Sequence, residues 1–201
     1  MLFKTLAGTI FWIITWIGVI FVIREVKTYK IIAHHQKYSL DALVSDDTLR
    51  IAQETAQALN TKPPNLYYTH RTSFASLIIS LLPGKQPNIL YGSDVAAFNE
   101  ICQRGILAHE LAHHKRRFRA RNLIKVFTLR NFHSTEEEKA VDALAAQHVG
   151  AHCIIAALEA TKDVLKLWDI SDPALFTELD ERIASLTGTV NAPAMPRMEK
   201  Q

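Results

Sequence analysis

The chain has 201 residues, of which 48% are hydrophobic and 21% charged, and its formal net charge at pH 7 is +3. Its two cysteines, Cys102 and Cys153, are too few and too isolated for a disulfide framework, and the chain has no internal repeat or low-complexity tract. Composition therefore excludes a disulfide-rich scaffold and a repeat protein, and the length suits one globular domain beside a shorter segment.

The N-terminal segment is the most apolar part of the chain. From Leu6 to Ile23 no residue carries a charge, and this length is near the lower limit for a helix that crosses a bilayer. The following residues, Arg24 to Lys27, offer no small-x-small cleavage site of the kind that ends a signal peptide. We therefore expect one N-terminal transmembrane helix that is retained as a membrane anchor.

Basic residues around this anchor predict its orientation. Lys4 and the amino terminus flank one end, and the other end is followed by Arg24, Lys27, Lys30 and Lys37. The positive-inside rule then places the rest of the chain in the cytoplasm. The expected location is single-pass in a membrane, taken to be a bacterial inner membrane, with membrane lipid as a partner.

The next part of the chain, as far as about residue 98, predicts one helix and a small sheet. Asp46 to Leu59 has helical periodicity after Ser45, a good N-cap. Three strands are expected, with a turn before the last of them: Asn65 to Thr69, Ser76 to Leu82 and Asn88 to Tyr91. Because nearly everything after Asn99 has helical patterns, we expect a mostly helical α+β domain with a small antiparallel sheet.

The most specific pattern in the chain is His109-Glu110-Leu111-Ala112-His113. On a helix, the two histidines lie one turn apart on the same face, so both imidazoles can reach one metal ion. Glu110 lies about 100° around the helix from His109, where it can act as general base toward a water at the metal. Asn99 is a plausible N-cap for this half-buried helix. The alternative is an ordinary amphipathic helix with surface histidines.

A catalytic zinc ion usually has three protein ligands, so a third ligand is needed. Ser134 and Glu137 fit a capping box, which predicts that a helix starts there. In that helix Glu138 and Asp142 lie on the apolar face, where a charged side chain needs a partner. Glu138 as third ligand and Asp142 as acceptor for the N–H of a ligand histidine would satisfy both. A solvated Glu138, or His133 as ligand, is the alternative.

Between these two motifs lies a basic run, Lys115 to Arg121, which continues to Lys125. Such a run could bind nucleic acid or rest on anionic lipid headgroups. It could also be a solvated helix end whose charges complement the helix dipole. With an anchor on the same chain, lipid is the favoured contact, and no nucleic-acid partner is expected.

The stretch Ile106 to His114 resembles the active-site helix of the HtpX-type zinc metallopeptidases, a family that includes the CAAX prenyl endopeptidases. Glu138 to Asp142 is similar to the family's E-x-x-A-D signature, with Val141 in place of the usual alanine, and Asp180 to Leu186 is similar to its C-terminal helix. The resemblance covers roughly Asp46 to Leu186. It implies a zincin-like fold, one zinc ion per chain and Glu138 as the third ligand.

The resemblance also implies how substrate binds and where this chain departs from the family. Pro87 to Gly92 resembles the strand before the active-site helix, and in relatives an edge strand holds the substrate, so Ile89, Leu90 and Tyr91 are expected to contact it. Many members carry a His-Pro ahead of the C-terminal helix, whereas this chain has Asp172-Pro173. Any oxyanion-stabilising role of that histidine would pass to another group, with candidates His148, His152 and Arg182.

Three parts are expected: a membrane anchor with its juxtamembrane segment (1–30), a zinc metallopeptidase domain (31–186) and a disordered tail (187–201). The expected function is hydrolysis of peptide bonds in membrane-associated or misfolded proteins. The alternatives are a zinc-binding membrane adaptor or holdase without peptidase activity and, less favoured, a basic nucleic-acid-binding module.

Overall fold

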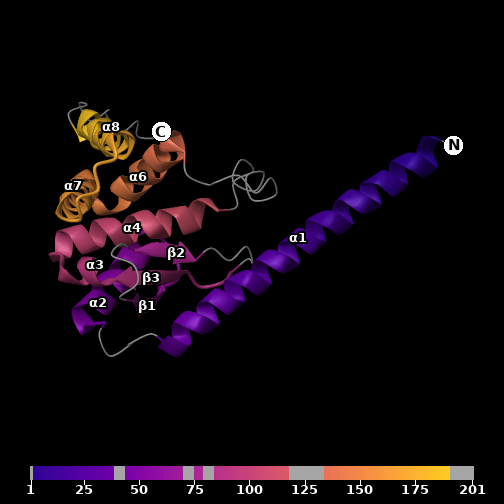
Figure 1. Ribbon diagram of the computed structural model, residues 1–201, viewed down its shortest axis with the longest axis horizontal. Coiled ribbons are helices and arrows are strands. Elements are labelled where there is room, and N and C mark those ends of the chain that lie inside the picture. The colour runs from indigo at the N-terminus through magenta and orange to yellow at the C-terminus, as the bar shows by residue number, and fades with distance from the viewer. Residues whose placement is uncertain (1, 39–43, 70–74, 79–83, 118–133, 191–201) are drawn as a thin grey trace, which may run out of the picture.

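The structure is a computed structural model of the chain, and it describes residues 2–38, 44–69, 75–78, 84–117 and 134–190. In this part the protein is mostly helical, with seven helices and one three-stranded sheet (Figure 1). The elements, in chain order, are α1 (Leu2–Tyr38), α2 (Asp46–Ala58), β1 (Asn65–Thr69), β2 (Ser76–Ile78), β3 (Asn88–Gly92), α3 (Ser93–Ala97), α4 (Glu100–Arg116), α6 (Thr135–Val149), α7 (Ala151–Leu167) and α8 (Pro173–Val190).

Helix α1 differs from the predicted membrane anchor. It does not end with its apolar stretch but continues through Arg24 and Lys27 to Tyr38, and Thr28 is buried where the helix contacts β1. Its N-terminal half projects away from the other elements (Figure 1). Among the described residues, no helix combines the length and the apolar character of a membrane span. The prediction of a transmembrane helix is therefore wrong for this structure.

The sheet is mixed, so the prediction of an antiparallel sheet is also wrong. The strand order is β1-β3-β2, with β3 antiparallel to β2 but parallel to β1. Gly84 lies in a turn before β3 with a positive φ of 71°, at a position where the sequence suggested a turn. However, β3 then lies between the two earlier strands instead of at the edge. The parallel pairing of β3 with β1 joins segments that are not consecutive strands, and local turn signals do not reveal it.

Helix α4 lies at the centre of the fold, between the sheet and the layer formed by α6, α7 and α8 (Figure 1). It is covered on both sides, and the side chains of Leu107, Ala108, Leu111 and Ala112 are fully buried. Gly105 allows α7 to approach closely, because a Cβ at this position would lie only 2.1 Å from the backbone carbonyl oxygen of Cys153. The core therefore fixes α4, and with it any side chain that α4 presents.

The local start and stop signals are mostly where the sequence places them. Helix α2 begins after Ser45, whose side chain accepts a hydrogen bond from the backbone N–H of Thr48. The short helix α3 has no counterpart among the predicted elements. Helix α8 continues to Val190, so the first residues of the predicted disordered tail are helical.

Candidate metal centre

Helix α4 begins where its capping residue predicts. The side chain of Asn99 accepts a hydrogen bond of 3.0 Å from the backbone N–H of Cys102, which satisfies one of the free donors of the first turn. The helix then runs without interruption to Arg116, so His109 and His113 lie one turn apart. Both side chains are 17% exposed, and they face the N-terminal turn of α6.

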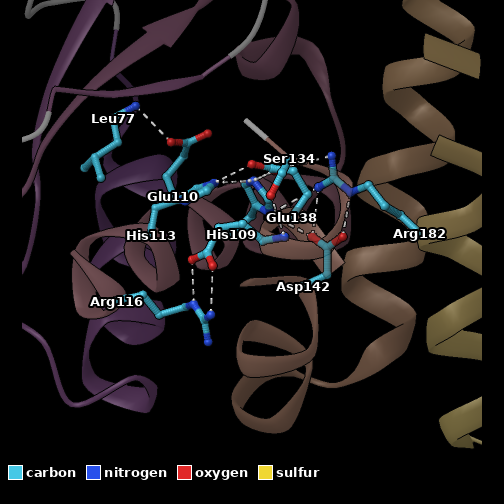
Figure 2. A network of polar contacts seen from close by, with 10 residues as sticks. Leu77, His109, Glu110, His113, Arg116, Ser134, Glu138, Asp142 and Arg182 are labelled. Atoms are coloured by element: carbon cyan, nitrogen blue, oxygen red, sulfur yellow. Dashed lines mark hydrogen bonds and ion pairs between the residues drawn. The ribbon is translucent and has the colours of Figure 1, made fainter. Parts of the chain in front are cut away.

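The first turn of α6 is held in place by a cap and an ion pair. Ser134 accepts a hydrogen bond from the backbone N–H of Glu137. The two carboxylate oxygens of Glu137 accept hydrogen bonds of 2.9 and 3.0 Å from the guanidinium of Arg116, at the end of α4. This bidentate contact joins the two helices beside the histidines (Figure 2). The next residue, Glu138, is consequently buried and directed at them.

Three side chains converge where α4 meets α6. The Nε2 atoms of His109 and His113 lie 3.1 Å apart, and the carboxylate oxygens of Glu138 lie 3.2 Å from the first and 3.4 Å from the second (Figure 2). Ligand atoms of a tetrahedral zinc ion, each about 2.0–2.1 Å from the metal, are about 3.3 Å apart. One ligand atom from each of His109, His113 and Glu138 lies within 4.8 Å of the others, so the three residues could hold one metal ion. Two imidazoles and a carboxylate are also a donor set of catalytic zinc sites.

Asp142 and Arg182 form a second group of residues, on the Nδ1 side of His109. Its Nδ1 atom lies 2.7 Å from Oδ1 of Asp142, and an imidazole that donates there leaves its Nε2 lone pair for a metal. Arg182, on α8, donates to both oxygens of Asp142 over 2.7 and 2.9 Å, and its Nη1 atom lies 3.5 Å from Oε2 of Glu138. Arg182 thereby fixes the acceptor of one ligand and contacts another (Figure 2).

The carboxylates of this cluster favour positively charged neighbours. Burial opposes a charge on His109, but its hydrogen bonds with Asp142 and Glu138 raise the pKa to about 10. Burial also opposes ionisation of Glu138, but its contacts with His109 and His113 hold the pKa below the usual range. The pKa of Asp142 is likewise lowered, since its bonds with His109 and Arg182 outweigh burial. In the metal-free protein a proton on His109 thus provides the positive charge that a metal ion would bring.

This charge balance predicts that metal binding releases protons. Because a pKa of about 10 keeps His109 protonated at neutral pH, a metal must displace that proton. We expect zinc affinity to keep rising between pH 7 and 9, by about tenfold per unit. A histidine with an ordinary pKa near 6.5 would instead give a constant affinity above pH 7. Calorimetric titrations in buffers of different ionisation enthalpy measure the affinity and the protons released, and a flat profile would contradict this prediction.

Glu110, the residue next to His109, contacts the sheet. Its Oε2 atom accepts a hydrogen bond of 2.8 Å from the backbone N–H of Leu77, in β2 (Figure 2). Leu77 is the middle residue of β2. Since its N–H donates to Glu110, it points away from β3. The N–H and C=O groups of one strand residue point to the same side, so Leu77 presents both at this edge of β2. The predicted general base therefore lies between the metal ligands and a strand edge.

The predicted substrate-binding residues Ile89, Leu90 and Tyr91 lie in β3, the central strand. Because β3 is hydrogen-bonded to β1 on one side and to β2 on the other, its backbone cannot take a further strand. Ile89 and Tyr91 are also fully buried. The edge next to Glu110 belongs to β2 instead, which the sequence did not reveal because strand order is not a local property.

The remaining candidates lie in different places. His148 and His152 are exposed, and His152 contacts the thiol of Cys153. His133 and most of the basic run lie outside the described residues. The start of that run makes contacts within the domain: Lys115 donates to the carbonyl of Leu59 at the end of α2, and Arg116 binds Glu137.

The sequence did not reveal the contact between Arg116 and Glu137, because Glu137 fits a capping box with Ser134. Removing one partner leaves the other charge buried, so Arg116→Met should lower the free energy of unfolding by about 3 kcal/mol. The double variant Arg116→Met/Glu137→Met should recover part of this loss. Denaturant unfolding of the metal-free proteins measures both, with Arg50→Met, in the exposed pair with Glu54, as control. A loss no larger than that of the control would contradict a structural role.

No family model matches the chain, and no curated protein or solved structure matches it either. The function must therefore be inferred from the geometry of the described residues.

Proposed function

We propose that the protein is a zinc-dependent metalloendopeptidase of the HtpX type that its motifs resemble. One observation carries the proposal: the Nε2 atoms of His109 and His113 lie 3.1 Å apart, and one carboxylate oxygen of Glu138 lies 3.2 Å from the first and the other 3.4 Å from the second. Glu110 is placed beside them on the same helix, at an edge of the sheet. A structural zinc site would be closed by a fourth protein ligand, whereas among the described residues the group contains three such residues.

Each residue of the centre would have a defined part in the reaction. Zinc, when bound, polarises the scissile carbonyl and lowers the pKa of a water molecule toward 7. Glu110 accepts the proton of the attacking water and delivers it to the leaving amine. Asp142 keeps the Nδ1 proton of His109 in place, so that Nε2 remains available as a ligand. Arg182 holds Asp142 and balances the second carboxylate of the cluster.

Substrate would bind as an extended strand along β2. The Leu77 N–H and C=O can pair with a peptide backbone, which gives affinity without reading the sequence. A substrate carbonyl that accepts the Leu77 N–H would release Glu110 from its present hydrogen bond. Both oxygens of Glu110 would then be available for the water and its proton. Unfolded segments of proteins, which expose free backbone, are the substrates that suit this mode of binding.

The proposal is tested by cleavage of unstructured protein and of fluorogenic peptides. Protein stripped by a chelator should be inactive, and one equivalent of zinc should restore cleavage. Mass spectrometry of the products should show two fragments whose masses sum to that of the substrate plus one water. A zinc-loaded protein that binds peptide without cleaving it would instead support the adaptor alternative.

A further inference from the structure

A cavity opens directly beside the metal-binding residues, between α4, α7 and α8. Its volume is about 150 Å³, and His109 and Glu110 form one side of it. Neither His113 nor Glu138 lines it, so it lies on one side of the cluster only. Ala75, the residue before β2, also lines it, so the cavity lies next to the strand edge at which Leu77 meets Glu110.

The walls of this cavity are apolar and firmly packed. They are formed by Ile106 of α4, Ile154 and Leu158 of α7, and Leu179 of α8. Ile154, Leu158 and Leu179 belong to the hydrophobic core and are nearly inaccessible to solvent. An apolar cavity of similar volume in a protein core accommodates a benzene molecule. A leucine, isoleucine, methionine or phenylalanine side chain therefore fits in size, whereas tryptophan does not.

The ionisable groups that line the cavity all have other partners or roles: His109 and Glu110 belong to the centre, and the remaining two pair with each other. Asp142 and Arg182 line it, but they bind one another through two hydrogen bonds. Thr161, on α7, uses its hydroxyl to donate to the carbonyl of Ala157. A lysine side chain placed here would compete for Glu110, the base that the proposed reaction needs, and an aspartate would lose its hydration beside two carboxylates, Glu110 and Asp142. The cavity consequently suits a neutral side chain.

We propose that this cavity is the specificity pocket of the centre and receives one neutral, leucine- to phenylalanine-sized side chain of a peptide substrate. The proposal rests on the proposed function, because the occupant is a residue next to the scissile bond. A substrate strand along β2 has side chains that point alternately to its two sides, so one residue beside the metal can enter the space between α4 and α7. Cleavage would then require an apolar residue at one position of the substrate and would not restrict the residues at the other positions.

The test is a series of peptides that differ at one position: Ala, Val, Leu, Phe, Trp, Asp or Lys. Zinc-loaded wild-type protein should cleave the Leu and Phe peptides with a kcat/KM at least tenfold above those of the Ala, Trp, Asp and Lys peptides. Peptide affinity for the zinc-loaded Glu110→Gln protein, measured by fluorescence anisotropy, should follow the same order without any turnover. Equal values across the series overturn the proposal.

The second part of the test uses a variant whose larger side chain partly fills the cavity. Thr161→Ile adds carbon atoms at the wall and should lower the affinity and kcat/KM for the Leu and Phe peptides at least tenfold, with little change for the Ala peptide. Thr187→Ile is the matched control, because exposed Thr187 makes the same hydroxyl bond to the carbonyl four residues earlier. An unchanged order of peptides in Thr161→Ile overturns the proposal. If no peptide is cleaved but affinity follows the series, the proposed function fails and the pocket stands.

Discussion

Glu110→Gln should lower kcat/KM for peptide hydrolysis by about 10²–10⁴-fold and leave the bound zinc in place. Glutamine has the same shape and can still accept the Leu77 N–H, so α4 and β2 should keep their contact. It cannot take a proton from the attacking water, however, and the reaction loses its base. Peptide cleavage and zinc content, measured on the same sample, separate loss of chemistry from loss of metal.

Glu100→Gln is the control for this variant, since it makes the same change on an exposed face of the same helix. Glu100 binds Arg50 and Arg104 at the surface, far along α4 from the cluster. The activity of the Glu100→Gln protein should match that of the wild type. Cleavage retained by Glu110→Gln would remove Glu110 from the mechanism, and a wild type as inactive as the variant would favour the adaptor.

Glu138→Gln should weaken zinc binding by more than about 100-fold, the upper range for replacing a residue that only supports a ligand. The change replaces the anionic carboxylate with a neutral amide. The imidazoles of His109 and His113 then remain without the third ligand. Competition with a chelator of known affinity measures the zinc dissociation constant. Activity at fixed zinc should fall together with occupancy.

Glu136→Gln is the matched control, because Glu136 lies in the same turn of α6 with 78% of its side chain exposed. Its zinc affinity should remain that of the wild type. If Glu138→Gln bound zinc as tightly as this control, the third ligand would be another residue, and the centre would need a different description.

Local sequence signals predicted the parts of the site that lie within one helix. Spacing alone places His109 and His113 on one face, and Asn99 and Ser134 begin their helices where their capping chemistry indicates. Glu138 and Asp142 could be recognised from the sequence, because two carboxylates on the apolar face of a helix need partners. The three residues that could hold a metal ion and the carboxylate that contacts His109 could thus be named without knowing the fold.

Contacts between distant segments could not be predicted in the same way. Arg182 meets Asp142 from 40 residues away in the sequence, and the resemblance suggested it only as a candidate for the oxyanion, not as a partner of Asp142. Arg116 looked like part of a basic run, and only the structure reveals its pair with Glu137. The order of the three strands, and hence which edge lies beside Glu110, likewise depends on how β3 inserts between β1 and β2.

The N-terminal helix shows the opposite error, in which a local signal was given too much weight. The uncharged run from Leu6 to Ile23 has the length of a short membrane span, but in the structure it is one part of a longer helix. The continuation through Arg24 and Lys27 to a contact with β1 was not visible from hydropathy, since the charged residues looked like the flank of a span.

The most direct test of the metal centre is a zinc titration of metal-free protein, with bound zinc and the rate of peptide hydrolysis followed together. Activity should rise in proportion to bound zinc and stop rising at one ion per chain. The same titration of Glu138→Gln should need far more zinc, and that of Glu110→Gln should bind one ion without activity. Full cleavage by metal-free protein, or one tightly bound zinc ion without any cleavage by the wild type, would contradict a zinc-dependent peptidase.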